Sequence, residues 1–431
     1  MRYAPVDPTL FITNRSRLAR GLKSKAIAIL HASDVSPTSG DGTRPFIQQT
    51  DFFYLCGIDQ ADCILVICPD AVEEKHREML FIPETNAEIA LWEGEKYSQE
   101  EARTVSGVRT VYWTGMFEKI LRPLLIASDH IYLNTNEHLR ADTAVESRDR
   151  RFIDWCQRSF PLHHYQRLAP LMRDLRIIKS EMEISLISRA CGITEKGFRR
   201  LFGFIRPGVW EFEIEAEIVH EYIRNRSRGP AFEPIVASGA NSCVLHYVKN
   251  HHQCREGDLV LIDTGAEYAN YAADVTRTIP VDGRFTPRQR DVYESVLRIQ
   301  RAAIQELHPG ITLDQYQRQV GEYMEGELVR LGLLQRGEVK RQSKDDPLYR
   351  KYFMHGVSHH LGLDVHDNGD RNQPLSAGMV LTCEPGIYIR EEGFGIRLEN
   401  DILLTATGPV DLTRNIPIEP DEIEELMNRR S

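Results

Sequence analysis

The sequence lacks several features that would point to particular classes of protein. It has no Cys-x-x-Cys pair, and no uninterrupted apolar run approaches the roughly 18–20 residues that span a bilayer. Positive charge is not in excess, since 53 Lys and Arg residues stand against 63 Asp and Glu residues, for a formal net charge of −10. The opening residues, Met-Arg-Tyr-Ala-Pro-Val-Asp-Pro, contain no apolar signal core. We therefore expect a cytoplasmic protein with neither a nucleic-acid nor a membrane partner.

The eight cysteines favour a reducing compartment. Most stand in apolar surroundings, such as Val66-Ile-Cys68 and Leu381-Thr-Cys383. Buried free thiols fit such surroundings better than disulfides or a thiolate metal site. With 431 residues, of which 42% are hydrophobic, the chain is long enough for two or three domains with well-buried cores.

The residue pattern divides the chain into two predicted domains. In the first third, polar segments alternate with short apolar runs that are typical of buried strands, at residues 26–30, 63–68 and 79–82. This alternation predicts an α/β domain. The pattern weakens near residues 161–170, and we place the junction at about 165–176. We therefore take residues 1–170 as an N-terminal α/β domain and residues 171–431 as a second domain.

The second domain has the signals of helices mixed with strands. Three helices are predicted from capping boxes, in which a hydroxyl residue is followed three residues later by Glu or Gln. Their N-caps are Ser180, Thr286 and Thr312. Four runs resemble strands, at residues 258–265, 271–280, 378–383 and 395–404. We expect an α+β domain whose helices cover one side of a largely antiparallel sheet.

The strand-like runs carry acidic residues at positions that the pattern predicts to be buried: Asp263, Asp274, Glu384 and Glu399. Ionised carboxylates are almost never fully buried unless they are paired or bind a metal, because each costs several kcal/mol to desolvate. For any one of them, a partner Arg or backbone N–H groups would be explanation enough. Four in one domain, together with four histidines in the run 355–366, favour a metal site.

Two divalent cations would neutralise four converging carboxylates, which cannot all stay ionised unaided. Hydrolases with two metal ions place the ions roughly 3.5–4 Å apart. Because four carboxylates and one imidazole form an oxygen-rich set of ligands, we expect Mn²⁺, although Zn²⁺, Co²⁺ and Fe²⁺ remain open.

The motifs that carry these residues resemble those of a known family. Residues 259–280 are similar to the Asp-x10-Asp element of the creatinase/methionine-aminopeptidase ("pita-bread") metallopeptidases. The other motifs of that family follow in its order, in the runs 355–366, 382–386 and 396–399. The N-terminal third resembles the Xaa-Pro aminopeptidase (aminopeptidase P) branch, through residues 11–18, 49–57 and 90–94. The resemblance covers essentially the whole chain, and it implies a creatinase-like N-terminal domain followed by a pita-bread catalytic domain.

Position by position, the resemblance implies five metal ligands, namely Asp263, Asp274, His359, Glu384 and Glu399. Asp263 would chelate one ion, and Asp274 and Glu399 would bridge both. His359 and Glu384 would complete the other ion, and Glu384 would also transfer protons during catalysis. His360, next to the ligand, would point away from it and be structural.

The resemblance implies further roles outside the ligand set. His366 and His246 would stabilise the substrate carbonyl as it becomes an oxyanion. His355 would line the proline pocket, and Arg397, on the same strand face as Glu399, would hold the carboxylates. Trp92 would reach a neighbouring subunit's site, since the family forms dimers or tetramers.

The predicted activity is that of a dinuclear-metal aminopeptidase, which releases the N-terminal residue from peptides with proline in second position. Two alternatives stay open at this point: a prolidase that cleaves Xaa-Pro dipeptides, and a non-catalytic relative that only binds peptides. The complete ligand set argues against creatinase, which uses no metal, and the long N-terminal domain argues against methionine aminopeptidase.

Overall fold

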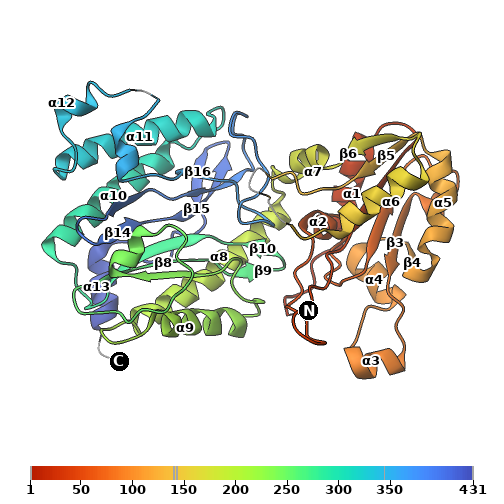
Figure 1. Cartoon of the computed structure of the whole chain (residues 1–431), viewed down its shortest axis with the longest axis horizontal. Coiled ribbons are helices and arrows are strands. Elements are labelled where there is room, and N and C mark those ends of the chain that lie inside the picture. The colour runs from red at the N-terminus through yellow and green to blue at the C-terminus, as the bar shows by residue number, and fades with distance from the viewer. Residues whose placement is uncertain (1, 139–140, 142–143, 344, 430–431) are drawn as a thin grey trace. The chain divides into compact units, whose positions relative to one another are not determined.

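The chain divides into two compact units. The structure, a computed structural model, describes residues 2–138, 141, 144–343 and 345–429 (Figure 1). One unit comprises Tyr3–Arg176, and the other comprises Ile177–Ser431 together with Arg2. The junction that the sequence suggests, between residues 170 and 171, lies within helix α7 (Ala169–Arg176), whereas the units separate after the last residue of that helix.

The N-terminal unit is built on a mixed sheet of six strands in the order β4-β3-β2-β1-β5-β6. The strands are β1 (Ala26–His31), β2 (Ile64–Ile67), β3 (Glu78–Ile82), β4 (Thr110–Trp113), β5 (His130–Leu133) and β6 (His164–Arg167). Strand β1 pairs antiparallel with β2 and parallel with β5. The first three strands fall on the apolar runs that predicted them.

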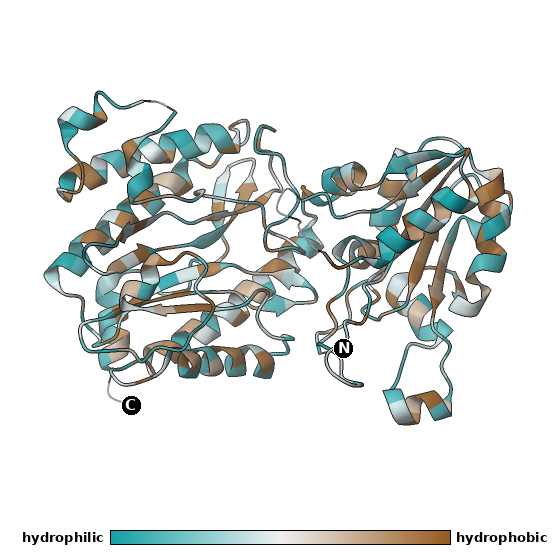
Figure 2. Ribbon diagram, viewed as in Figure 1, coloured by the Kyte–Doolittle hydropathy of each residue, from teal (hydrophilic) through white to brown (hydrophobic). Residues whose placement is uncertain are grey.

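Helices pack on this sheet through their apolar positions. In α5 (Phe117–Ala127), Leu121 and Leu125 contact the sheet core, and α6 (Arg148–Ser159) contributes Cys156. The remaining helices of the unit, besides α7, are α1 (Thr9–Gly21), α2 (Thr50–Cys56), α3 (Ala87–Glu93) and α4 (Gln99–Ser106). The α/β prediction for this part of the chain is confirmed. Hydrophobic residues concentrate in the strands, as Figure 2 shows for both units.

In the second unit, the three helices predicted from capping boxes are confirmed. Ser180, Thr286 and Thr312 each accept a hydrogen bond from the backbone N–H three residues later. They begin α8 (Glu181–Phe202), α10 (Pro287–Glu306) and α11 (Leu313–Arg330). The unit's other helices are α9 (Glu211–Arg224), α12 (Arg336–Val339) and α13 (Pro420–Asn428). Among the described residues, no helix combines the length and the apolar character needed to cross a membrane.

The strands of the second unit pair antiparallel throughout the described residues, as expected. They form the sets β11-β8-β7, β12-β15-β16, β13-β14 and β10-β9. Their bounds are β7 (Ile235–Ser238), β8 (Leu259–Thr264), β9 (Glu267–Tyr268), β10 (Tyr271–Ala272), β11 (Val275–Pro280), β12 (Val380–Cys383), β13 (Gly386–Ile389), β14 (Phe394–Arg397), β15 (Asn400–Thr405) and β16 (Gly408–Asp411). Helices surround these strands, with α10 and α11 above them and α9 below in Figure 1.

Two runs that the sequence predicts as single strands are each broken at an acidic residue. Asp274 lies between β10 and β11, and Glu399 lies between β14 and β15. The chain changes its pairing partner at both points, so the freed backbone groups bond elsewhere. The N–H of Asp274 donates to Asp401 (3.1 Å), and the N–H of Glu399 donates to the carbonyl of Thr276 (3.1 Å). The prediction of uninterrupted strands was therefore wrong at these acids.

Candidate metal centre and substrate site

Strand pairing brings the four predicted acids to one place. Asp263 lies in β8, where it is paired with Thr276 of β11, and Asp274 lies two residues before Thr276. Cys383 of β12 is paired with Asn400 of β15, so the flanking residues Glu384 and Glu399 leave the ladder at the same end. The hydroxyl of Thr276 links the two sets of strands, since it donates to Glu399 Oε2 at 2.6 Å.

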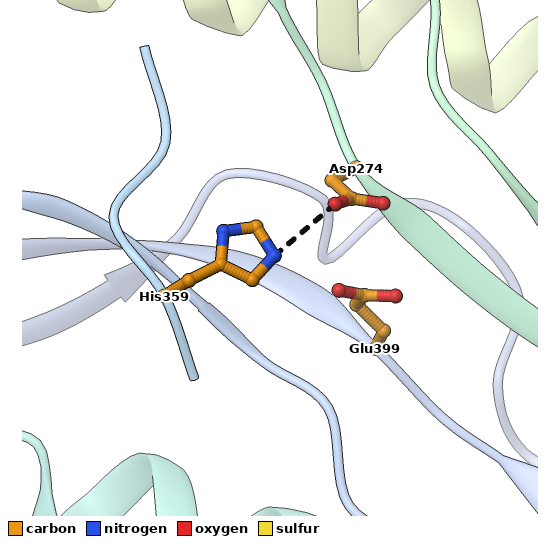
Figure 3. A group of neighbouring side chains, drawn as sticks. All are labelled: Asp274, His359 and Glu399. Atoms are coloured by element: carbon orange, nitrogen blue, oxygen red, sulfur yellow. Dashed lines mark ion pairs between the residues drawn. The ribbon is translucent and has the colours of Figure 1, made fainter. Parts of the chain in front are cut away.

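The imidazole of His359 completes the cluster. One possible ligand atom from each of Asp274, His359 and Glu399 lies within 4.8 Å of the others. In Figure 3 the ring of His359 points at the carboxylate of Asp274, with that of Glu399 beside it. His359 Nε2 lies 3.4 Å from Asp274 Oδ2 and 3.7 Å from Glu384 Oε1.

Arg397 is the cation of this cluster, and it is almost fully buried. Its Nη2 contacts Asp263 Oδ2 at 2.5 Å, its Nε donates to the hydroxyl of Thr276, and its Nη1 donates to the hydroxyl of Tyr388 (2.8 Å). Sequence reasoning placed Arg397 beside the carboxylates but missed Tyr388, which resembles an ordinary core residue of a strand.

The carboxylates carry more charge than the protein balances. Burial raises the pKa of Asp274 and of Glu399 well above the usual values, and repulsion from the neighbouring acids raises both further. Burial also raises the pKa of Glu384, and the positive charges of His359 and Arg397 oppose this rise. One guanidinium therefore stands against four carboxylates in a buried space.

The arrangement fits divalent cations. Oδ1 of Asp263 and Oδ1 of Asp274 are buried, and within the described part of the chain they accept no hydrogen bond. Buried oxygens of this kind are costly unless a cation binds them. Carboxylate oxygens with one imidazole nitrogen are a donor set for Mn²⁺, Zn²⁺ and related ions, as the sequence suggested.

His355 is held as a neutral acceptor beside this cluster. Its Nδ1 bonds the carbonyl of Gly356 (2.8 Å), so this nitrogen carries the proton and its Nε2 accepts from the hydroxyl of Tyr388 (2.8 Å). Burial, together with the charges of Arg397 and His246, lowers the pKa of His355 to about 3.

The other predicted histidines differ in their positions. The exposed His246 lies close enough to His355 for its charge to act there. The ring of His366 meets that of His359 edge to face, with centroids 4.4 Å apart. His360 is buried, and its ring lies outside the group formed by Asp274, His359 and Glu399.

Trp92 lies in α3 of the N-terminal unit and is 82% exposed, so its role at a neighbouring subunit's site stays a prediction. Sequence reasoning also missed Asp401. Its buried carboxylate accepts the N–H of Asp274 and the thiol of Cys191 (3.4 Å), and so fixes the backbone that carries a predicted ligand.

Comparison with known proteins agrees with this geometry. Residues 185–406 match metallopeptidase family M24, and residues 11–132 match the aminopeptidase P N-terminal domain. The chain is 35% identical to the Xaa-Pro aminopeptidase of Escherichia coli K12, over 97% of each chain. It is similar to the solved aminopeptidase PepP of Pseudomonas aeruginosa, with a TM-score of 0.89, 31% identity and 99% coverage of both chains. A zinc-substituted E. coli aminopeptidase P in complex with product gives a TM-score of 0.87 at 34% identity, with 98% of this chain and 99% of that chain covered.

Proposed function

The chain belongs to metallopeptidase family M24, and from this membership we propose that it is a dinuclear-metal aminopeptidase that releases the N-terminal residue from peptides with proline in second position. The observation that carries the proposal is the convergence of four carboxylates, two buried and two half-buried, and one imidazole beside three further histidines. The proposed substrates are the Xaa-Pro peptides named for its relatives.

Five residues would hold the metal ions. Asp263 would bind one ion, Asp274 and Glu399 would bridge both, and His359 with Glu384 would bind the second. We propose Mn²⁺ for both positions because the donor set is rich in oxygen. When bound, the two ions would offset the carboxylate charge and lower the pKa of a water molecule toward neutrality.

Glu384 is the proposed proton carrier. Its carboxylate would accept a proton from the attacking water and return it to the leaving proline nitrogen. Oε2 of Glu384 lies 3.5 Å from Nδ1 of His355, the histidine that bonds the hydroxyl of Tyr388.

The histidines would hold the substrate. His366 and His246 would donate to the carbonyl oxygen as negative charge develops on it. His355, kept neutral by burial, would form part of the wall for the pyrrolidine ring and would be oriented by the hydroxyl of Tyr388. An Xaa-Pro bond has no N–H at proline, so a site that recognises the ring instead of that donor suits this bond.

The test is a manganese-supplemented assay that measures release of the first residue from an Xaa-Pro-Xaa tripeptide. We expect turnover by the parent and a loss of at least about 10²-fold in Glu384→Ala, the scale of general acid–base catalysis. The control is Glu391→Ala, because Glu391 is an exposed acid whose ion pair with Lys351 lies at the surface. Equal rates in the parent and Glu384→Ala would refute the role of Glu384.

The same assay separates the alternatives. Faster cleavage of an Xaa-Pro dipeptide than of the tripeptide would favour a prolidase. Stoichiometric Mn²⁺ binding without turnover of either substrate would favour a peptide-binding relative. A homo-oligomer, dimer or tetramer, and a cytoplasmic location also stay predictions, which sedimentation and cell fractionation would test.

A further inference from the structure

A buried ion pair lies beneath the histidine segment and takes no part in the proposed chemistry. Lys179 Nζ lies 3.0 Å from Asp367 Oδ2, and each side chain is 1% exposed. Burying an ion pair costs about as much as the pair returns, so such a pair is weak support for stability. Its position suggests another purpose, because Asp367 directly follows His366 in the sequence.

The lysine end of the pair is fixed to the body of the unit. Lys179 directly precedes Ser180, the N-cap of the 22-residue helix α8. The backbone N–H of Lys179 also donates to the carbonyl of Gly378, close to the start of β12 (2.8 Å). The ammonium group therefore has a rigid base from which to hold its partner.

A chain of hydrogen bonds connects Asp367 to the predicted ligand His359. The N–H of Asp367 donates to the carbonyl of His360 at 2.9 Å. The same carbonyl lies 3.0 Å from Nδ1 of His359. A carbonyl oxygen only accepts, so Nδ1 of His359 carries a proton, and Nε2 is the ring nitrogen that faces Asp274, 3.4 Å away. Outer partners of this kind fix the tautomer and the orientation of a metal-binding histidine.

Close packing leaves the segment little freedom around the pair. A Cβ atom at Gly362 would collide with the carboxylate of Asp367 and would lie 3.1 Å from Cε of Lys179. The carbonyl of Gly362 accepts the N–H of Ala272, two residues before Asp274 (2.8 Å). The segment is thereby joined to the strand region that supplies a predicted bridging carboxylate.

We propose that the Lys179–Asp367 ion pair is a positioning clamp, which fixes residues 359–367 so that His359 faces the carboxylates and His366 stays beside it. The clamp sets the affinity of the site for its divalent cation. This inference rests on the proposed function only in treating His359 as a ligand. It makes Lys179 and Asp367 positioning residues, since both side chains are buried and neither is a predicted ligand.

The test uses three variants, Lys179→Met, Asp367→Asn and the double variant, in the full-length protein. Each single variant leaves one buried charge without its partner, so we expect a lower melting temperature. The double variant buries no charge, and its melting temperature should return close to that of the parent. Its affinity for Mn²⁺, measured by titration calorimetry well below the melting temperature, should stay about 10- to 100-fold weaker than in the parent.

The matched control is Asp51→Asn in the N-terminal unit. Asp51 forms a similar buried pair with Arg176 (2.7 Å), in the unit that contains no predicted ligand. We expect this variant to lower the melting temperature and to leave Mn²⁺ affinity unchanged. Parent-like Mn²⁺ affinity in the Lys179→Met/Asp367→Asn protein would overturn the clamp and leave the pair a structural contact only.

A further variant covers the case in which the double variant does not fold. Asp367→Glu keeps the charge and displaces the carboxylate by one methylene, so it should weaken Mn²⁺ binding, and unchanged binding would overturn the clamp. Mn²⁺ binding is measured without peptide. If the parent fails to cleave Xaa-Pro peptides while the variants still lose Mn²⁺ affinity, the proposed function fails and the clamp stands.

Discussion

The carboxylates and the histidines of the site are positioned by different kinds of structure. Asp263 lies within a ladder of paired strands, and Glu384 and Glu399 leave the paired ends of β12 and β15 together. His359 and His366 instead lie on a segment outside the named strands. Its first part, residues 357–361, is joined to β12 by backbone hydrogen bonds, such as the one from the N–H of Thr382 to the carbonyl of His359 (2.9 Å). Strand pairing therefore places the acids, and backbone hydrogen bonds also hold His359 against β12. Buried polar side chains instead hold the residues beside His366 and His246.

The second histidine loop follows the same rule. Glu211, at the start of α9, is fully buried and holds the segment that carries His246. Its carboxylate accepts hydrogen bonds from the N–H and hydroxyl of Ser238, the amide of Asn241, the hydroxyl of Tyr247 and the N–H of His252. A single carboxylate thus ties together residues on both sides of a predicted substrate-binding histidine.

The largest expected effect comes from removing one charge on the carboxylate side. Glu399→Gln keeps the shape of the side chain and the contact with Thr276, but it removes a bridging charge. We expect Mn²⁺ affinity and peptidase activity to fall by more than about 100-fold, since even partners outside the ligand set change affinity by about 10–100-fold. Calorimetry and the tripeptide assay measure the two losses.

Without metal, the same variant should be more stable than the parent. The buried carboxylates repel one another, so removing one charge relieves the repulsion that raises their pKa values. Thermal unfolding of the chelator-treated proteins would show this as a higher melting temperature for Glu399→Gln. A lower melting temperature would mean that the carboxylates do not repel one another. The proposed difference between the carboxylates and the histidine loops would then be wrong.

A smaller effect is expected from loosening the Glu211 loop. His246→Ala should lower kcat by about 10²- to 10³-fold if it removes an oxyanion donor, with Mn²⁺ affinity unchanged. Glu211→Gln should lower kcat by at most about 10²-fold, since it shifts the same group without removing it. Steady-state kinetics on the tripeptide separate kcat from KM.

A protein that carries both Glu211→Gln and His246→Ala decides whether Glu211 acts through His246. If it does, Glu211→Gln should cost nothing further once His246 is alanine, because the two changes remove one interaction. Additive losses would show that Glu211 supports the fold and not the histidine. A change in Mn²⁺ affinity in either single variant would also break the comparison, since this loop carries no predicted ligand.

The sequence predicted the acids because desolvation makes a carboxylate in an apolar run conspicuous. It predicted the helices because a capping box is local to four residues. It could not predict that the runs around Asp274 and Glu399 break, since those breaks follow from which strands pair in three dimensions. The ion pair that we propose to position His359 was hidden for the same reason: Lys179 and Asp367 are 188 residues apart, and Lys179 looks like an ordinary flank of a helix.

The smallest expected effect is on the pH dependence of folding stability. It has opposite signs for the histidine segment and for the carboxylates. Burial, together with the charge of Lys179, lowers the pKa of His360 to about 3. The unfolded chain then binds more protons than the folded chain between about pH 3 and pH 6.5, so this group's contribution to stability is lost as pH falls through that window. The raised pKa of Glu399 acts in reverse, and its contribution is lost as pH rises above the usual glutamate range.

Urea unfolding of chelator-treated protein across pH 4–8 would separate the two sides. Replacing His360 by leucine should flatten the acid side of the profile, by at most about 1.4 kcal/mol per pH unit, the limit for one proton. Glu399→Gln should instead reduce the loss of stability toward neutral pH. If both variants changed the same limb of the profile, the histidine loop and the carboxylates would titrate as one unit. Separate changes are expected because strand pairing and side-chain anchoring bury the two kinds of group independently.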